Sequence, residues 1–413
     1  MMRFFFIVLL LSFSSASAFS QVNYVLNPDF EKYSFCPWGF DQIKAANHWS
    51  GLDTSQSSNP PAIPEYCNSC ASGTSILVGV PSSGYYFQYG QSGDGFAQII
   101  SFFDESVSSQ YQRDYLQGRL VRRLTSGKSY CVSFYVSLTE ASKHAIKEIG
   151  AYLDNGIIDT TKNYGLPQTK YTPQVSNTGG ILNDTANWVK IEGTFVANGT
   201  EQFITIGNFK SKANTTYAPI PANSRNNGNS AWSWYLIDDV SVIESDLKAD
   251  AGPDRHIGLG DSTYLGRAKE VGLECSWSVL GSSTVIGNGA GIWVKPATTT
   301  SYVVTQTLCG QVKRDTVWVG VWGVGVSSTA GKSGQGYTLS PNPNAGAFEL
   351  RQSIPADESL PAEAIDMLGR KVYAGELHFR EGVAAVQTEG LAPGLYVLKF
   401  GGPFVRPLRF EIR

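Results

Sequence analysis

The amino-acid sequence predicts an all-β protein built from more than one domain. Short segments in which apolar and polar residues alternate recur along the chain, and turns rich in Gly, Pro and Asn separate them. No segment has a convincing long helical period. The composition agrees, because aromatic residues reach 12% while charged residues make up only 16% of the 413 residues. We therefore expect several β-sandwiches in series.

The first 20 residues have the pattern of a secretory signal peptide. Arg3 precedes an apolar run, residues 4–11, and a Ser- and Ala-rich stretch follows. Cleavage before Gln21 fits, with cleavage before Phe19 as the alternative. The run is too short to span a membrane, and no other apolar run is long enough. In an exported chain the six cysteines predict disulfides. A net charge of −3 does not suggest nucleic acid or an acidic membrane surface as a partner.

Residues 21–245 predict a β-sandwich of jelly-roll type. Its clearest strand is residues 130–138, in which Val132, Phe134, Val136 and Leu138 alternate with polar or small residues. Further strand patterns follow at the positions listed here: 149–153, 188–191, 203–206 and 234–242. Residues 140–149 fit either a short helix or a strand. Many spaced strands joined by long polar loops are typical of a jelly roll.

Four cysteines lie in this first domain: Cys36, Cys67, Cys70 and Cys131. Three pairings are possible, and the sequence does not choose among them. We prefer a disulfide that closes a loop from Cys36 to Cys67 or Cys70. Cys67 and Cys70 have the spacing of half a zinc site, but no second Cys or His pair completes one.

Residues 249–320 predict a second, smaller sandwich. A Cys275-Ser276-Trp277 strand is followed by strand patterns at 302–307 and 315–319, with Cys309 between them. This arrangement resembles an immunoglobulin-like domain. The resemblance implies a Cys275–Cys309 disulfide, which should contribute roughly 3–4 kcal/mol in the chain-entropy model. We expect this domain to act as a spacer.

Residues 321–336 have the Gly- and Ser-rich composition of a linker, and residues 337–413 predict a small antiparallel β-sandwich. Pro-Asn-Pro at 341–343 with Gly346 marks a turn before a strand. Gly369 suits the positive φ of a hairpin turn. A Pro-Gly turn at 393–394 leads into another strand, and the last residues alternate between apolar and charged.

That C-terminal segment resembles the sorting domain of type IX secretion in Gram-negative bacteria. The motif residues occur in the family's order: Pro341, Asn342, Pro343, Gly346, Phe348, Gly369, Gly394 and Tyr396. The resemblance implies recognition by outer-membrane secretion machinery and cleavage of the tail in the linker. It also implies attachment of the remaining protein to surface lipopolysaccharide. We therefore expect an extracellular, cell-surface protein.

The first domain resembles the galactose-binding-like jelly rolls, a superfamily that includes many carbohydrate-binding modules. The resemblance rests on Asn27-Pro28-Asp29-Phe30-Glu31, Trp49, Gly127-Lys128-Ser129-Tyr130 and Ile237-Asp238-Asp239-Val240. It implies a structural calcium ion held by Glu31 and Asp239, with Asp238 as the alternate ligand if the strand register is shifted by one.

Sugar binding requires aromatic rings together with amide or charged groups, because a sugar presents CH faces and hydroxyl edges. Two stretches offer both, the aromatic run 85–89 and the Asn-rich loop 223–229 beside a tryptophan. The candidate ligand-binding residues are Tyr85, Tyr86, Tyr89, Arg225, Asn226 and Trp232.

The sequence carries no catalytic motif that we recognise. The four histidines, His48, His144, His256 and His378, are spread over three domains. There is no Gly-x-Ser-x-Gly and no His-Glu-x-x-His. Asp238 and Asp239 are adjacent on a strand, so we expect their side chains to point to opposite faces. We therefore expect a non-catalytic binding protein. The alternatives are a structural or adhesive surface protein without a small ligand, or a glycan hydrolase whose carboxylates are distant in sequence.

Overall fold

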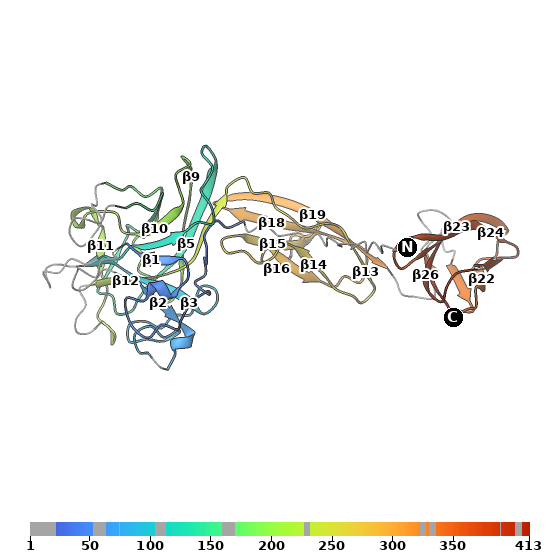
Figure 1. The fold of residues 1–413 in the computed structure, drawn as a ribbon, viewed down its shortest axis with the longest axis horizontal. Coiled ribbons are helices and arrows are strands. Elements are labelled where there is room, and N and C mark those ends of the chain that lie inside the picture. Colours follow the sequence, from blue (N-terminus) through green and yellow to red (C-terminus); the bar gives the residue numbers. More distant parts are fainter. Residues whose placement is uncertain are drawn as a thin grey trace, which may run out of the picture. The chain divides into compact units, whose positions relative to one another are not determined.

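The computed structural model describes the following residues: 22–52, 63–73, 75–103, 113–158, 170–226, 232–322, 328–329, 336–388, 390–400 and 407–413 (Figure 1). The predicted signal peptide and most of the predicted linker lie outside these ranges. The chain divides into two compact units. The first contains residues up to Asp254, Tyr264–Val294 and Ser301–Trp318, and the second contains Arg255–Thr263, Lys295–Thr300 and Val319–Arg413.

The expected all-β class is confirmed. The described residues form β-strands and three one-turn 3-10 helices, η1 (Ile43–Ala45), η2 (Ser69–Ala71) and η3 (Lys212–Asn214). The segment 140–149, for which helix and strand were both open, contains a strand, β6 (His144–Ile146), which pairs with β11 (Tyr217–Pro219). No helix in the described part of the chain is both long enough and apolar enough to cross a bilayer.

Two five-stranded sheets form the jelly roll in the first unit. The first sheet, which we call the inner sheet, has the order β1-β4-β10-β7-β8, with bounds Trp49–Gly51, Leu116–Arg119, Phe203–Gly207, Gly150–Asp154 and Val175–Ser176. The second sheet, which we call the outer sheet, has the order β2-β3-β12-β5-β9, with bounds Glu65–Asn68, Gly95–Phe103, Trp232–Glu244, Ser129–Leu138 and Val189–Val196. Apolar residues of both sheets form one buried core between them.

Strand β5 shows why this sequence makes a sheet with two covered faces. Val132, Phe134, Val136 and Leu138 are all buried in the core between the sheets, as the alternating pattern predicts. The intervening side chains point to the opposite face of the outer sheet, where other segments cover them. Ser137, for example, accepts a hydrogen bond from Gln88 Nε2 at 3.0 Å. This second covered face carries both acidic clusters described below.

The immunoglobulin-like region follows the jelly roll. Within the first unit, β15 (Glu274–Val279) pairs with β16 (Val285–Asn288) and with β18 (Thr300–Leu308). Strands β14 (Thr263–Gly266) and β17 (Gly291–Val294) form a separate pair. Trp277 is fully buried, and its Nε1 donates to Gly289 O at 3.0 Å. In the second unit, β13 (Arg255–Gly258) pairs in parallel with the end of β19 (Gln311–Trp322).

The expected Cys275–Cys309 disulfide is wrong. Cys309 is bonded to Cys131 of the jelly roll, with the two Cα atoms 5.7 Å apart, and Cys275 is a free, buried thiol. The strand register explains the difference, because Cys275 lies opposite Gln306. Cys309 therefore lies beyond the end of the pairing, in a turn where its φ is +45°. It faces the jelly roll and not the core of its own sandwich.

This disulfide closes a sequence separation of 178 residues, which corresponds to about 5 kcal/mol in the chain-entropy model. Polar contacts surround it within the first unit. Glu274 accepts from Lys190 Nζ at 2.7 Å and from Tyr135 OH at 3.3 Å. A Cβ on Gly272 would lie 2.1 Å from Ser241 Oγ, so the backbone there approaches the outer sheet too closely for any side chain.

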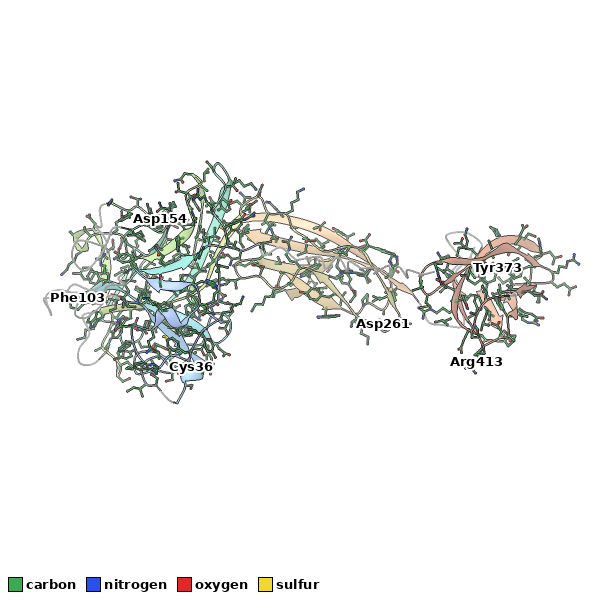
Figure 2. All side chains as sticks on the ribbon, in the orientation of Figure 1. Cys36, Phe103, Asp154, Asp261, Tyr373 and Arg413 are labelled. Carbon is green, nitrogen blue, oxygen red and sulfur yellow. A yellow bond between two sulfur atoms is a disulfide. The ribbon has the colours of Figure 1, made fainter. Side chains whose placement is uncertain are left out.

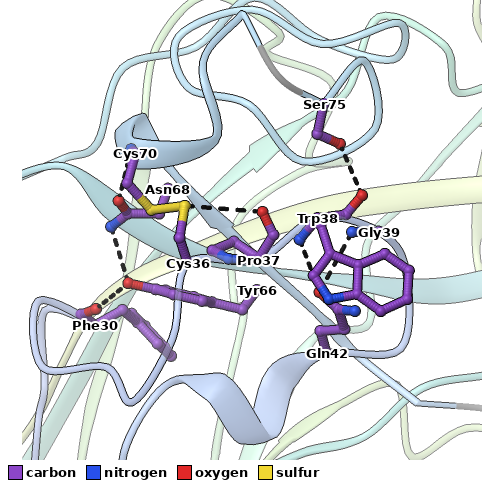
Figure 3. The surroundings of a disulfide bond; sticks show 10 residues. All are labelled: Phe30, Cys36, Pro37, Trp38, Gly39, Gln42, Tyr66, Asn68, Cys70 and Ser75. Carbon is purple, nitrogen blue, oxygen red and sulfur yellow. Dashed lines mark hydrogen bonds between the residues drawn. A yellow bond between two sulfur atoms is a disulfide. The ribbon is translucent and has the colours of Figure 1, made fainter.

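The second disulfide joins Cys36 to Cys70 (Figure 3), one of the two loop closures expected from the sequence. Asn68 Oδ1 accepts from Cys70 N at 2.9 Å and caps η2. Asn68 Nδ2 donates to Tyr66 OH, which in turn donates to Phe30 O at 2.9 Å. Cys67 is a free thiol, buried on the outer sheet. The disulfide and these hydrogen bonds fix the loops that cover one end of the outer sheet.

The second unit contains the C-terminal sandwich. One sheet has the order β20-β21-β22-β25, with bounds Ser328–Thr329, Gly336–Ser340, Ala347–Gln352 and Val383–Gln387. The other has the order β24-β23-β26-β27, with bounds Lys371–Phe379, Glu358–Asp366, Gly394–Phe400 and Leu408–Ile412. Gly369 has φ +81° in the β23–β24 turn, as expected for that hairpin. Phe348 and Tyr396 both pack on Phe410, at ring distances of 4.8 and 5.5 Å.

Candidate functional site

An exposed aromatic pair lies on the loop between β2 and β3. Phe87 and Tyr89 are 51% and 63% exposed, and their rings meet edge to face with centroids 5.8 Å apart. The intervening Gln88 points inward, where its Nε2 donates to Ser137 Oγ and to Ala186 O. Alternation around a buried glutamine therefore directs both rings to solvent.

Side chains from three other segments fix this loop. The Glu140 carboxylate accepts from Phe87 N at 3.1 and 3.2 Å. Trp188 Nε1 donates to Tyr89 O at 3.0 Å, and Arg225 Nη1 donates to Tyr86 O at 3.0 Å. We use the name aromatic surface for Phe87, Tyr89 and Trp188 together with Glu140 and Arg225. It combines ring faces with one anionic and one cationic group.

The structure brings the predicted ligand-binding residues into one neighbourhood but buries several of them. Tyr86 is fully buried, with its OH donating to Gly79 O, and Asn226 is 3% exposed, with its Nδ2 donating to Pro221 O. These two residues therefore hold the loops together and cannot contact a ligand at the surface. Tyr89 is exposed, and Arg225 is half-buried at the edge of the same surface.

Tyr85 and Trp232 are half-buried and pack in an aromatic row. Tyr85 meets Trp234 edge to face at 4.7 Å, and Trp232 stacks on Trp234 at 6.1 Å. Trp232 also lies 4.5 Å from Phe103, which is labelled in Figure 2. Phe87, which is not among the candidate residues predicted from the sequence, is more exposed than either Tyr85 or Trp232. Residues 86–89 alternate between buried and exposed, but the sequence alone does not say which of the two faces is buried.

A first acidic cluster consists of Glu31, Asp238 and Asp239, the residues for which the resemblance to galactose-binding-like jelly rolls implies calcium. All three accept hydrogen bonds from the loop 91–95. Glu31 Oε1 accepts from Asp94 N and Gly95 N at 2.7 and 2.8 Å. Asp238 Oδ2 accepts from Gln91 N at 2.8 Å and Ser92 N at 3.3 Å, and its Oδ1 accepts from its neighbour's N.

The expectation that Asp238 and Asp239 point to opposite faces is wrong. Asp238 binds Ser92 N, and Asp239 Oδ1 accepts from Ser92 Oγ at 2.6 Å, so both carboxylates meet the same loop residue. A β-bulge between Asp238 and Ser241 places one extra residue on β12 opposite β5. Asp239 has φ +48° within that bulge, which turns its side chain toward the loop.

Burial raises the pKa of each carboxyl group in the first cluster, most strongly for Asp238, while the loop N–H donors act in the opposite direction. The carboxylate oxygens are suitable ligands for calcium. However, the carboxylates of the first cluster do not form a group whose ligand atoms all lie within 4.8 Å of one another. Among the described residues, one such group exists, namely Cys131, Glu192 and Cys309. Its two cysteines form the interdomain disulfide, so it is not a metal site.

A polar groove of about 500 Å³ lies between residues 176–184 and the start of β9. Asn177, Asn183 and Glu192 are among its lining residues, and no aromatic residue lines it. It therefore lacks a platform for a sugar ring, and the aromatic surface is the better candidate site.

The sequence matches no protein-family model and no curated protein. Among solved structures, the chain is similar to the CBM22-1 xylan-binding domain from Paenibacillus barcinonensis Xyn10C, with 11% identity and a TM-score of 0.27 over 53% of this chain and 92% of that chain. It is similar to the K3 adhesin domain of Lys-gingipain from Porphyromonas gingivalis W83, with 13% identity and a TM-score of 0.21 over 47% and 94% of the two chains. A chimeric titin Z1Z2 tandem gives 14% identity and a TM-score of 0.16 over 39% and 93%. Scores this low carry no argument about function.

Proposed function

We propose that the protein is a non-catalytic, cell-surface glycan-binding protein whose ligand docks on the aromatic surface. The observation that carries the proposal is that Phe87 and Tyr89 stay exposed although their loop is held rigidly from three sides. Two exposed rings on a fixed loop offer apolar faces to the CH faces of a sugar. Glu140 and Arg225, beside them, offer an acceptor and donors to sugar hydroxyls.

Rigidity favours binding because a loop whose backbone is already fixed loses little conformational entropy when a ligand docks. Phe87 N is anchored by the Glu140 carboxylate, and Tyr89 O is anchored by the Trp188 indole. A loop that served no binding role would not need these hydrogen bonds to its backbone. The arrangement therefore supports recognition of a ligand and not merely loop packing.

The test is affinity electrophoresis of the full chain in gels containing soluble polysaccharides, followed by titration calorimetry with oligosaccharides of the retained class. Phe87→Ala and Tyr89→Ala should each weaken binding about tenfold or more, equivalent to about 1.4 kcal/mol. Trp293→Ala is the matched control, because Trp293 is 70% exposed but lies on β17 of the immunoglobulin-like region. Unchanged retention of Tyr89→Ala and Phe87→Ala would contradict the proposal, and absence of retention on any glycan would favour an adhesive protein without a small ligand.

We also propose that the C-terminal sandwich directs export through type IX secretion and that surface lipopolysaccharide is the anchor. The support is that residues from the first and last motifs, Phe348 and Tyr396, share one core through Phe410. Deleting residues 336–413 should leave the protein in the periplasm, whereas the full chain should reach the cell surface. Cell fractionation that finds the truncated protein on the surface would refute the export role.

The first acidic cluster is our proposed structural calcium site, with Glu31 and Asp239 as ligands and Asp238 as the alternate. The support is that three buried or half-buried carboxylates converge on one loop. Burying like charges together is costly unless a cation or a proton compensates for them. In this proposal, backbone carbonyls and water complete the oxygen ligands.

A further inference from the structure

A second acidic cluster lies on the outer sheet, on the same face as Asp238. Glu65 on β2 pairs directly with Gln98 on β3. Asp114 lies beside β3 just beyond the Glu65 end of β2. Its N donates to Ile100 O, and its Oδ2 accepts from Ile100 N at 2.7 Å. Glu65 and Asp114 therefore lie along the same edge of β3. Glu65 is beside Gln98 and Asp114 is beside Ile100, so the two are about 7 Å apart along the strand.

All the polar residues of this cluster are buried. Glu65 is 6% exposed, Gln98 is 0%, Asp114 is 1% and Trp234 is 9%. Trp234 belongs to the same face because it pairs with Ile100, two residues from Gln98. The cluster thus has two carboxylates, one amide and one indole N–H behind the loops that cover the sheet.

Several atoms of the cluster have no hydrogen-bond partner among the described residues. They are Glu65 Oε2, both Gln98 amide atoms and Trp234 Nε1. Buried polar groups in folded proteins are nearly always paired, so each orphaned atom needs an explanation. Here the orphaned atoms lie on three adjacent strands, β2, β3 and β12, of the same sheet face, which points to a shared missing partner.

No cation pairs with this cluster among the described residues. Neither Glu65 nor Asp114 forms an ion pair with a described residue. Arg113, next to Asp114 in sequence, directs its Nη1 to the carbonyl oxygens of Asn208 and Lys210 instead. A third carboxylate, Asp41, lies close enough to act electrostatically on both, and it is exposed. Two buried carboxylates without a counter-charge are strongly unfavourable.

We propose that Glu65, Asp114 and the Gln98 side-chain oxygen bind a divalent cation of the calcium type, at a site separate from the first acidic cluster. The donors are carboxylate and amide oxygens, which suit calcium better than zinc. The ion compensates for both charges and gives Glu65 Oε2 and Gln98 Oε1 their missing partner. Its coordinated waters provide acceptors for Gln98 Nε2 and Trp234 Nε1. Asp41 marks the solvent side from which the ion enters.

A buried water or a shared proton is the competing occupant, and Glu65→Gln separates the two cases. Glutamine keeps the shape of the side chain but removes its charge. If a cation binds, the variant loses one calcium equivalent. If the carboxyl is merely protonated or bound to water, the variant keeps the calcium stoichiometry of the wild-type chain.

The experiment uses the full chain, stripped of metal with chelator, and counts bound calcium by equilibrium dialysis. Glu65→Gln and Asp114→Asn should each bind one calcium fewer per chain than the wild type. Glu201→Gln is the matched control, since Glu201 is 1% exposed but both its oxygens accept backbone N–H groups, from Asn198 and Gly199. It should bind as much calcium as the wild type.

Terbium luminescence gives an independent readout that begins with the wild-type chain. Terbium replaces calcium and emits when a nearby indole is excited, so an ion beside Trp234 should give sensitised emission in the wild type, which excess calcium abolishes. Trp234→Phe should keep the calcium stoichiometry and lose most of that emission. Calcium stoichiometry unchanged in both Glu65→Gln and Asp114→Asn, or emission unchanged in Trp234→Phe, would overturn the proposal.

Discussion

The two acidic clusters lie on the same face of one sheet, yet their carboxylates accept different numbers of hydrogen bonds. In the first cluster Asp238 accepts three backbone N–H groups, from Gln91, Ser92 and Asp239. In the second, Asp114 accepts one N–H, from Ile100, and Glu65 Oε2 accepts none among the described residues. The difference arises from the covering segment. The loop 91–95 presents four backbone N–H groups to the first cluster, whereas Tyr85, whose ring meets Trp234 edge to face at 4.7 Å, packs against the second cluster.

This contrast shows that burial alone does not determine whether a carboxylate needs a bound cation. N–H donors around a carboxylate favour its ionised form, although burial still raises the pKa of Asp238 well above its ordinary value, and a bound ion adds to the stabilisation that the donors supply. A carboxylate buried without donors needs a proton or a cation. We therefore expect substitutions in the first cluster to destabilise the fold, and the response of the second cluster to depend on calcium and pH.

The largest expected effect is that of Asp238→Ala. This change leaves three backbone N–H groups without an acceptor at a fully buried position, which should cost about 3–5 kcal/mol of unfolding free energy. Urea unfolding followed by fluorescence measures the loss. Asp238→Asn retains one carbonyl acceptor and should lose less. A loss below about 1 kcal/mol for Asp238→Ala would mean that the loop donors are not what stabilises this cluster.

Calcium at the first cluster is the next largest effect. At a hundredfold excess over its dissociation constant, one bound ion contributes about 2.7 kcal/mol to stability. Thermal melting of Asp114→Asn in calcium and in chelator isolates this contribution from that of the second cluster. Glu31→Gln, added to Asp114→Asn, should abolish the remaining calcium-dependent rise in melting temperature. Identical melting curves of Asp114→Asn in calcium and chelator, with no calcium found by elemental analysis, would remove the ion from the first cluster.

The second cluster should also make stability depend on pH when calcium is absent. Burial, together with repulsion from Asp41 and against the hydrogen bond from Ile100 N, raises the pKa of Asp114 to about 7. Burial likewise raises the pKa of Glu65. Asp114 has a higher proton affinity in the folded chain than in the unfolded chain. Its contribution is therefore present at low pH and is lost as pH rises through about 7.

In chelator, unfolding free energy should fall by about 2–3 kcal/mol between pH 5 and pH 8 because of Asp114. The groups that face it, Glu65 from β2 and Asp41 beside η1, act in the same direction. Denaturant titrations across this range measure the slope, and Asp114→Asn should flatten it. Calcium should also reduce the slope, because a bound ion stabilises the ionised carboxylates. An equal slope in Asp114→Asn would assign the pH dependence to other groups.

The sequence predicted the fold class and much of the strand pattern because alternation reports directly on a half-buried strand, as in β5. It did not predict the pairing of Cys131 with Cys309, since the partners are 178 residues apart and no local pattern reports on which sandwich a turn faces. The resemblance to immunoglobulin-like domains favoured Cys275, whose side chain packs in the core of its own sandwich.

The candidate sites were predicted in part for a related reason. Composition located the aromatic stretch 85–89 but could not separate the buried Tyr86 from the exposed Phe87, because an alternating run does not say which of its two faces is buried. Glu31, Asp238 and Asp239 were placed at one cluster through the resemblance, and the structure brings them to one loop. Glu65, Gln98 and Asp114 escaped notice because isolated polar residues in strand patterns are ordinarily exposed. Their burial depends on loops that only the folded structure places over the sheet.

The smallest effect that distinguishes the clusters is that of Ser92→Ala. Ser92 Oγ donates to Asp239 Oδ1 at 2.6 Å, and its backbone N donates to Asp238 Oδ2. Alanine removes the hydroxyl alone and keeps the backbone donor, so the unfolding free energy should fall by about 1–2 kcal/mol. Part of the loss should be recovered in calcium, since an ion bound to Asp239 replaces the lost donor. Ser129→Ala, whose hydroxyl donates to Ser245 Oγ at 3.2 Å beyond the other end of β12, is the control and should show no such recovery. If both variants respond equally to calcium, Asp239 does not contact the ion, and Glu31 and Asp238 remain as the ligands to test.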